Sequence, residues 1–119
     1  MTVAYWIVAA ILALVMLAAG SSKLVQSEEK LRASVLPERR SLGTERFIGA
    51  VEVVGALGLI LPPLTGIAVI LAPIAAVGLA VTMLIAVIDH VRHSEPFPPA
   101  LVLMVVSIAV AVLGFLAWA

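Results

Sequence analysis

Residues 67–88 read IAVILAPIAAVGLAVTMLIAVI, a run without one charged side chain. About 20 apolar residues in a helix cross the ~30 Å hydrocarbon core of a bilayer. Three other stretches have the same character, so we predict four membrane spans, at residues 3–20, 47–61, 67–88 and 100–118. Each span is expected to be a helix, because a backbone in lipid must satisfy its own hydrogen bonds.

The composition supports a membrane protein. The 119 residues are 64% hydrophobic and 12% charged, with a mean hydropathy of +1.26, whereas a soluble domain is about half apolar and a quarter charged. Seven basic residues balance seven acidic ones, which argues against a nucleic-acid partner. The absence of cysteine excludes disulfides and thiolate-held clusters. We therefore predict an all-α membrane protein over residues 1–119, with four transmembrane helices in an antiparallel bundle.

The connections between the spans differ in length and character. The polar loop 21–46 is long, and residues 27–36 within it favour a short amphipathic helix at the membrane interface, with a solvated loop as the alternative. Residues 62–66, Pro-Pro-Leu-Thr-Gly, predict a tight turn after the second span. Pro73 is expected to kink the third span and to free the carbonyl group of Val69.

The charges lie on one side of the predicted bundle. All fourteen charged side chains fall in or beside loops 21–46 and 89–99, and the opposite side has none. The positive-inside rule then places these loops in the cytoplasm and both termini outside. Tyr5, Trp6 and Trp118 fall on the outer side, as an interfacial aromatic belt would.

Glu52 is the most informative residue in the sequence. It lies six residues after Arg46, about 9 Å into the second span at 1.5 Å per residue. A carboxylate at that depth is costly in lipid and is expected to face the bundle interior. Gly49, Gly55 and Ala56 surround it with small side chains, which favours close helix packing.

Lys23 ends the first span on the same side and can reach Glu52 if these spans are neighbours. One interpretation is a buried ion pair in a ligand pocket or proton path. The other is a structural pair that specifies the fold, with Lys23 extending to the interface. The sequence leaves both open.

Asp89, His90 and His93 end the third span on that side. Two histidines at i and i+3 share a helix face, but the sequence offers no third ligand, so we assign no metal site. The histidines could also pass protons or bond a carbonyl ligand such as a quinone. Together with Lys23 and Glu52 they could line one pocket that opens toward the charged loops.

Three segments resemble the DoxX-like membrane proteins. Residues 20–24 (GSSKL) resemble the close of that family's first span, residues 46–62 its second span with Gly, Glu, Gly and a closing Pro, and residues 90–95 its polar tail after the third span. The resemblance implies a four-helix bundle in a bacterial plasma membrane. It also implies that certain residues form a shared polar core: Lys23, Gly49, Glu52, Gly55 and His90.

The resemblance and the residues together allow three functional hypotheses. The leading one is an accessory subunit of a larger membrane complex, in which a quinone-linked oxidoreductase is the candidate; its partners would be the bilayer and other integral subunits or copies of itself. The second is an enzyme or binder that acts on a lipid or quinone. The third is a small proton-coupled transporter that depends on Glu52. No cofactor is identifiable from a motif, although a quinone or lipid is the candidate ligand.

Overall fold

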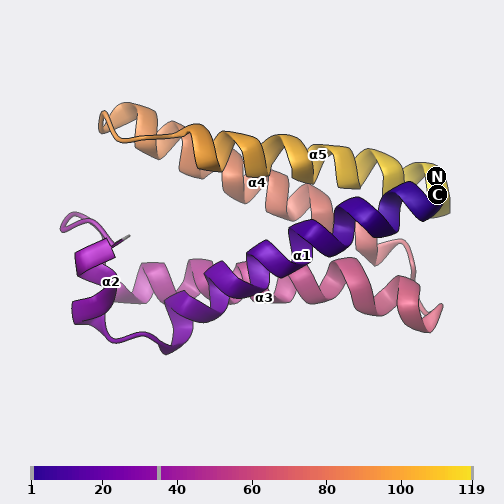
Figure 1. The fold of residues 1–119 in the computed structure, drawn as a ribbon, viewed down its shortest axis with the longest axis horizontal. Helices are drawn as coiled ribbons and strands as arrows, with labels where there is room; N and C mark the ends of the chain where they lie inside the picture. Colours follow the sequence, from indigo (N-terminus) through magenta and orange to yellow (C-terminus); the bar gives the residue numbers. More distant parts are fainter. Residues whose placement is uncertain (1, 35, 119) are drawn as a thin grey trace.

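The computed structural model describes residues 2–34 and 36–118, which form five helices and no strand (Figure 1). In chain order these are α1 (Thr2–Val25), α2 (Glu28–Ser34), α3 (Leu42–Thr65), α4 (Leu71–Arg92) and α5 (Pro98–Trp118). Four of them are long and apolar enough to cross a membrane. The predicted all-α membrane architecture is therefore confirmed.

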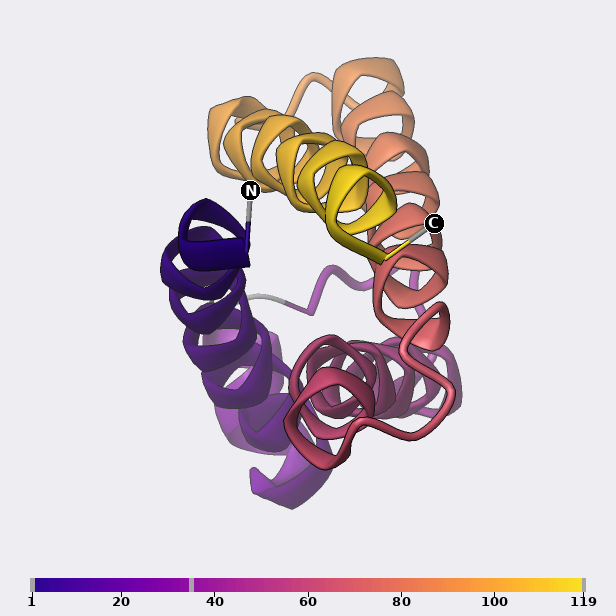
Figure 2. The ribbon, with the colours of Figure 1, turned by 90° about the vertical axis from the view of Figure 1, so that its right-hand side faces the viewer.

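The four long helices form an antiparallel bundle about a common axis. Each packs against two neighbours, in the ring order α1, α3, α4, α5 (Figure 2). The start of α1 and the end of α5 lie together at one end of the bundle, and α2 lies at the other (Figure 1). The molecule is 42 Å long, which matches the roughly 40–45 Å of a bilayer with its headgroups. We call the end that carries α2 the charged end, and the other the terminal end.

The core consists of apolar side chains on the inward faces of these helices. Its largest members are Tyr5, Leu12, Met16, Leu59 and Leu79. Most outward positions are also apolar and exposed, as expected when the surrounding solvent is lipid.

The turn predicted at residues 62–66 is wrong, because α3 continues through Pro62 and Pro63 to Thr65. The helix ends at Gly66, whose φ of 72° is a left-handed conformation that glycine adopts at no steric cost. Its N–H donates to the carbonyl oxygen of Pro62 at 2.9 Å. The second span therefore has 24 residues and is not short.

The kink predicted at Pro73 is also wrong. The third span starts at Leu71 and not at residue 67, so Pro73 lies in the first turn of α4, where the N–H of a residue has no helical partner in any case. The carbonyl oxygen of Val69 accepts a bond from Ala72 N–H at 3.1 Å. This proline consequently leaves no orphaned carbonyl group.

The polar connection contains the short helix that its pattern predicts. Helix α2 covers Glu28–Ser34, inside the predicted range 27–36, of which residue 35 lies outside the described residues. The hydroxyl of Ser27 accepts a bond from Lys30 N–H at 3.3 Å, and Leu31 is fully buried. Burial of the apolar Leu31 side chain therefore fixes α2 to the charged end of the bundle.

Candidate functional site

Lys23 and Glu52 form an ion pair between α1 and α3 near the charged end. Lys23 Nζ donates to Glu52 Oε1. The Glu52 side chain is 1% exposed, whereas that of Lys23 is 19% exposed. The carboxylate is thus the buried partner, and the ammonium group is the part that water or headgroups can reach.

This ion pair lies beside a close crossing of α1 and α3, at Gly20 and Gly49. A Cβ atom on Gly20 would lie 2.6 Å from the carbonyl oxygen of Gly49, and one on Gly49 would lie 2.8 Å from that of Gly20. Both distances are shorter than any tolerated carbon–oxygen contact, so neither position accepts a side chain without movement. The two glycines therefore set the separation at which Lys23 reaches Glu52.

Arg46 ties the same two helices together one turn closer to the charged end. Its guanidinium donates to the carbonyl oxygens of Lys23 at 3.2 Å, Leu24 at 2.5 Å and Gln26 at 3.1 Å. These carbonyl groups belong to the end of α1, where helical partners run out. A cation is also favoured there by the helix dipole. We call α1 and α3, joined in this way, the α1–α3 pair.

A second set of ion pairs links the loop before α3 to the end of α4. Arg39 donates to both carboxylate oxygens of Glu95, at 2.7 and 2.8 Å, and to Asp89 at 2.7 Å. Arg40 donates to the same Asp89 at 2.9 Å and to Glu45 at 2.7 Å. We call these five residues the arginine clasp. Its charges alternate in sign, so each carboxylate has at least one guanidinium partner.

Glu45 is the buried member of the clasp, with 1% of the residue exposed. It precedes Glu52 by seven residues, which places both carboxylates on the inner face of α3 two turns apart. The clasp therefore extends from the exposed loop toward the buried ion pair.

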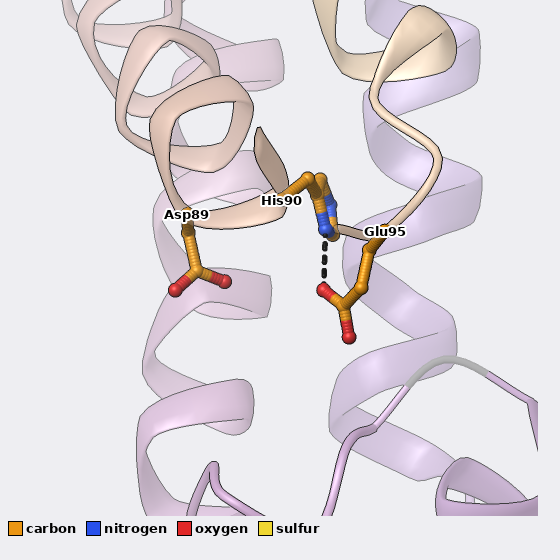
Figure 3. Close-up of side chains that lie close together, drawn as sticks. All are labelled: Asp89, His90 and Glu95. Atoms are coloured by element: carbon orange, nitrogen blue, oxygen red, sulfur yellow. Dashed lines mark hydrogen bonds and ion pairs between the residues drawn. The ribbon is translucent and has the colours of Figure 1, made fainter. Parts of the chain in front are cut away.

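His90 joins the clasp through Glu95. Its Nδ1 lies 2.9 Å from Glu95 Oε1, and the side chains of Asp89, His90 and Glu95 point the same way from the end of α4 and the loop that follows it (Figure 3). The hydrogen bonds from Arg39, and then the contact with His90, lower the pKa of Glu95 to about 2. Glu95 is therefore a carboxylate over the whole neutral range.

These three side chains also have the ligand types of a metal site. One ligand atom from each lies within 4.8 Å of the others. However, Arg39 contacts both carboxylates, and its positive charge already holds the position that a divalent cation would need. The arrangement is better described as an ion-pair network than as a metal site.

The structure divides the residues that the sequence grouped together. Lys23 and Glu52 bind each other, whereas Asp89 belongs to the clasp and His90 contacts the clasp through Glu95. His93 contacts Asp89: its Nδ1 lies 2.8 Å from the carbonyl oxygen of Asp89 and 3.5 Å from the carboxylate oxygen Oδ1.

The three small residues near Glu52 also divide between two neighbouring helices and the core. Gly49 faces α1, whereas a Cβ on Gly55 would lie 2.7 Å from a side-chain atom of Leu79 on α4. Ala56 is fully buried in the core. This face of α3 therefore serves two helix contacts.

The sequence reasoning missed Arg39, Arg40, Glu45 and Glu95 as members of the site. The spacing of seven residues from Glu52 would have identified Glu45 as a second inward carboxylate. Arg39 and Arg40 lie in a loop, where no helical period indicates the direction of a side chain.

Two grooves open on the outer surface of the bundle, and both are apolar. The larger, of about 520 Å³, lies between α3 and α4, and its walls include Phe47, Gly55 and Gly78. The smaller, of about 370 Å³, lies between α4 and α5. No residue of the ion pair or the clasp lines either groove, so the charged end and the grooves are separate features.

Four long apolar helices, with a carboxylate–ammonium pair buried between two of them, define a small integral membrane protein of the four-helix type. Residues 7–114 match the DoxX-like family, and the chain belongs to it. The chain matches no curated protein and no solved structure.

Proposed function

We propose that this protein is a non-catalytic subunit that binds a larger membrane complex, with its charged end in the cytoplasm of a bacterium. The observation that carries the proposal is the contrast between the two parts of the molecule. The ionisable groups of the candidate site are paired with one another, whereas the grooves that face lipid are apolar.

The size and apolar walls of the groove between α3 and α4 suit an apolar ligand or an apolar helix. Its volume of about 520 Å³ falls within the roughly 300–1,000 Å³ of sites that hold small molecules. An isoprenoid tail of a quinone, an acyl chain of a lipid, or a helix of the partner subunit suits such walls. A quinone-linked oxidoreductase is the kind of complex that would supply the first of these.

The pairing of Glu52 weighs against the two alternative functions. A lipid or quinone enzyme needs an acid or base that contacts its substrate, and a proton-coupled transporter needs a carboxylate that changes its protonation state. Glu52 is 1% exposed and bound to Lys23. Loss of turnover in a Glu52→Ala, His90→Ala double variant would support the enzyme, and loss of pH-driven transport in Glu52→Gln would support the transporter.

Native mass spectrometry of protein extracted from its own membrane tests the proposal. We expect the chain to leave the membrane with different, larger membrane proteins. A chain that emerges alone, or only as copies of itself, would contradict the subunit function.

Two variants make this experiment specific for the groove. Gly78 lines the groove, and a Cβ atom there would meet no atom within 4 Å, so Gly78→Leu starts its side chain in open space and extends it into the groove. Val102 is exposed on α5 and lines neither groove, so Val102→Leu is the control. We expect Gly78→Leu to lose the partner and Val102→Leu to retain it.

A further inference from the structure

The bundle consists of two helix pairs. The contacts that join one pair to the other differ between the two ends of the bundle. The α1–α3 pair is joined by the glycine crossing, the Lys23–Glu52 ion pair and Arg46. Helices α4 and α5, which we call the α4–α5 pair, pack closely where a Cβ on Gly114 would lie 3.0 Å from the Pro73 side chain. Each pair is therefore joined by contacts of its own.

At the terminal end the two pairs are joined by direct packing. A Cβ on Gly58 would lie 2.9 Å from the Cβ of Ala75, and the rings of Tyr5 and Trp118 meet edge to face with centroids 4.5 Å apart. Toward the charged end the α1–α3 pair and the α4–α5 pair diverge (Figure 1). The apolar groove between α3 and α4 lies in this seam, lined by residues 47–58 of α3 and by residues 71–79 in the terminal half of α4.

At the charged end the pairs are joined by the arginine clasp. Apart from bonds within the short turn between α3 and α4, every hydrogen bond or ion pair between the two halves of the described chain runs through Arg39 or Arg40. Among the described residues, the backbone of the loop that carries them bonds to residues of α2 and of the loop itself: Leu36 N–H donates to Leu31, Arg40 N–H donates to Pro37, and the Pro37 carbonyl oxygen accepts from Arg32.

We propose that the arginine clasp is a releasable latch. When it is broken, the α1–α3 and α4–α5 pairs hinge about the terminal end, and the seam between α3 and α4 opens from the charged end. The side chains of Arg39, Asp89 and Glu95 are about a third exposed, and ion pairs at such exposure are weak and screened by salt. A change in the salt concentration of the aqueous phase can therefore weaken the latch and, through it, widen the apolar groove between α3 and α4. This proposal does not depend on the subunit function.

Distance measurement between two spin labels tests the latch. The chain has no cysteine, so introduced cysteines carry the only labels. Phe47→Cys and Ile85→Cys are both exposed and report on the seam toward the charged end. Leu64→Cys and Leu116→Cys are exposed at the terminal end, one on each pair, and report on the hinge.

In the Arg39→Gln, Arg40→Gln double variant we expect a longer and broader distance distribution for the seam labels and no change for the hinge labels. Arg92→Gln is the matched control, because it removes a positive charge at the same end from a residue that forms no ion pair with the described residues. An unchanged seam distance in the double variant, or equal lengthening at both ends, would overturn the proposal.

Loss of Arg40 leaves the buried Glu45 without its partner, so the double variant can fail to fold. The single variant Arg39→Gln keeps that contact and is measured beside it; it removes three of the four hydrogen bonds that the clasp forms between the pairs and leaves the one from Arg40 to Asp89. The parent protein in 1 M salt needs no substitution, because the screening length falls from about 10 Å at 0.1 M to about 3 Å. We expect the seam distance to lengthen under both conditions, and no change under either would overturn the latch.

Discussion

The hydroxyl of Tyr5 donates a hydrogen bond of 2.6 Å to the carbonyl oxygen of Leu59, in the buried contact between α1 and α3. Pro63 lies four residues after Leu59 and has no N–H to offer that carbonyl. In a bilayer an unsatisfied carbonyl group is costly. Tyr5 therefore supplies from α1 the donor that Pro63 cannot supply within α3.

Tyr5→Phe is expected to destabilise the protein by about 1–3 kcal/mol, because it leaves this carbonyl group without a donor. Pro63→Ala restores a backbone N–H at the position that would bond Leu59, so the cost of Tyr5→Phe should shrink in that background. A double-mutant cycle from unfolding titrations in detergent measures the difference. Equal costs in the two backgrounds would show that the hydroxyl does not replace the missing N–H.

The glycines of the long helices should respond to substitution in opposite ways. Gly20→Ala and Gly49→Ala place a methyl group 2.6–2.8 Å from a carbonyl oxygen of the facing helix, so we expect both to force α1 and α3 apart and lower the thermal midpoint. Gly78 has open space around it. Gly78→Ala should therefore stabilise α4 by up to about 1 kcal/mol. A loss of stability in Gly78→Ala would contradict this.

The Lys23–Glu52 pair should be asymmetric under substitution. Lys23→Met leaves a buried carboxylate without its partner, which typically costs about 3–5 kcal/mol. Glu52→Gln leaves an ammonium group that can turn to the interface, so its cost should be smaller. The Lys23→Met, Glu52→Gln double variant should recover much of the loss. Unfolding in detergent compares the four proteins, and equal costs for the two single variants would rule out this asymmetry.

The number and course of the spans could be predicted from the sequence, because an apolar run of membrane length has few alternatives to a helix. The helix ends could not. Proline was expected to stop the second span because it removes a local donor, but the replacement donor, Tyr5, lies 54 residues away. A local pattern contains no information about such a partner.

The candidate site was predictable to a similar degree. Glu52 and Lys23 could be identified as a candidate ion pair, because a charge within an apolar segment needs a partner of opposite charge and the topology brings few such residues near Glu52. Arg39 and Arg40 were not, because the direction of a loop side chain depends on where α4 ends. The sequence also could not show that the apolar grooves lie apart from the charges, since that depends on how the helix pairs diverge.

Glu95 should give the charged end a defined response to acid. Its pKa is about 2 in the folded protein, against 4.5 in its ordinary state. A lowered pKa means that its contribution to stability is complete above about pH 4.5 and is lost as the pH falls toward 2. The difference in thermal midpoint between the parent and Glu95→Gln should be constant above this window, shrink through it and vanish below pH 2.

Glu38 supplies the control for this experiment, because it forms no ion pair with the described residues. Glu38→Gln should follow the parent over the whole range of pH. A difference between the parent and Glu95→Gln that is as large at pH 2 as at neutral pH would show that the carboxylate is not what stabilises the charged end.

The charge asymmetry predicts that the charged end faces the cytoplasm. Because the chain has no cysteine, single cysteines report on the two sides without background. Ile67→Cys, in the turn between α3 and α4, should react with a membrane-impermeant maleimide on intact cells. Glu38→Cys, in the loop before α3, should react only after the membrane is permeabilised. The reversed pattern would mean that a partner overrides the positive residues, and labelling of both positions on intact cells would mean that the chain inserts in two orientations.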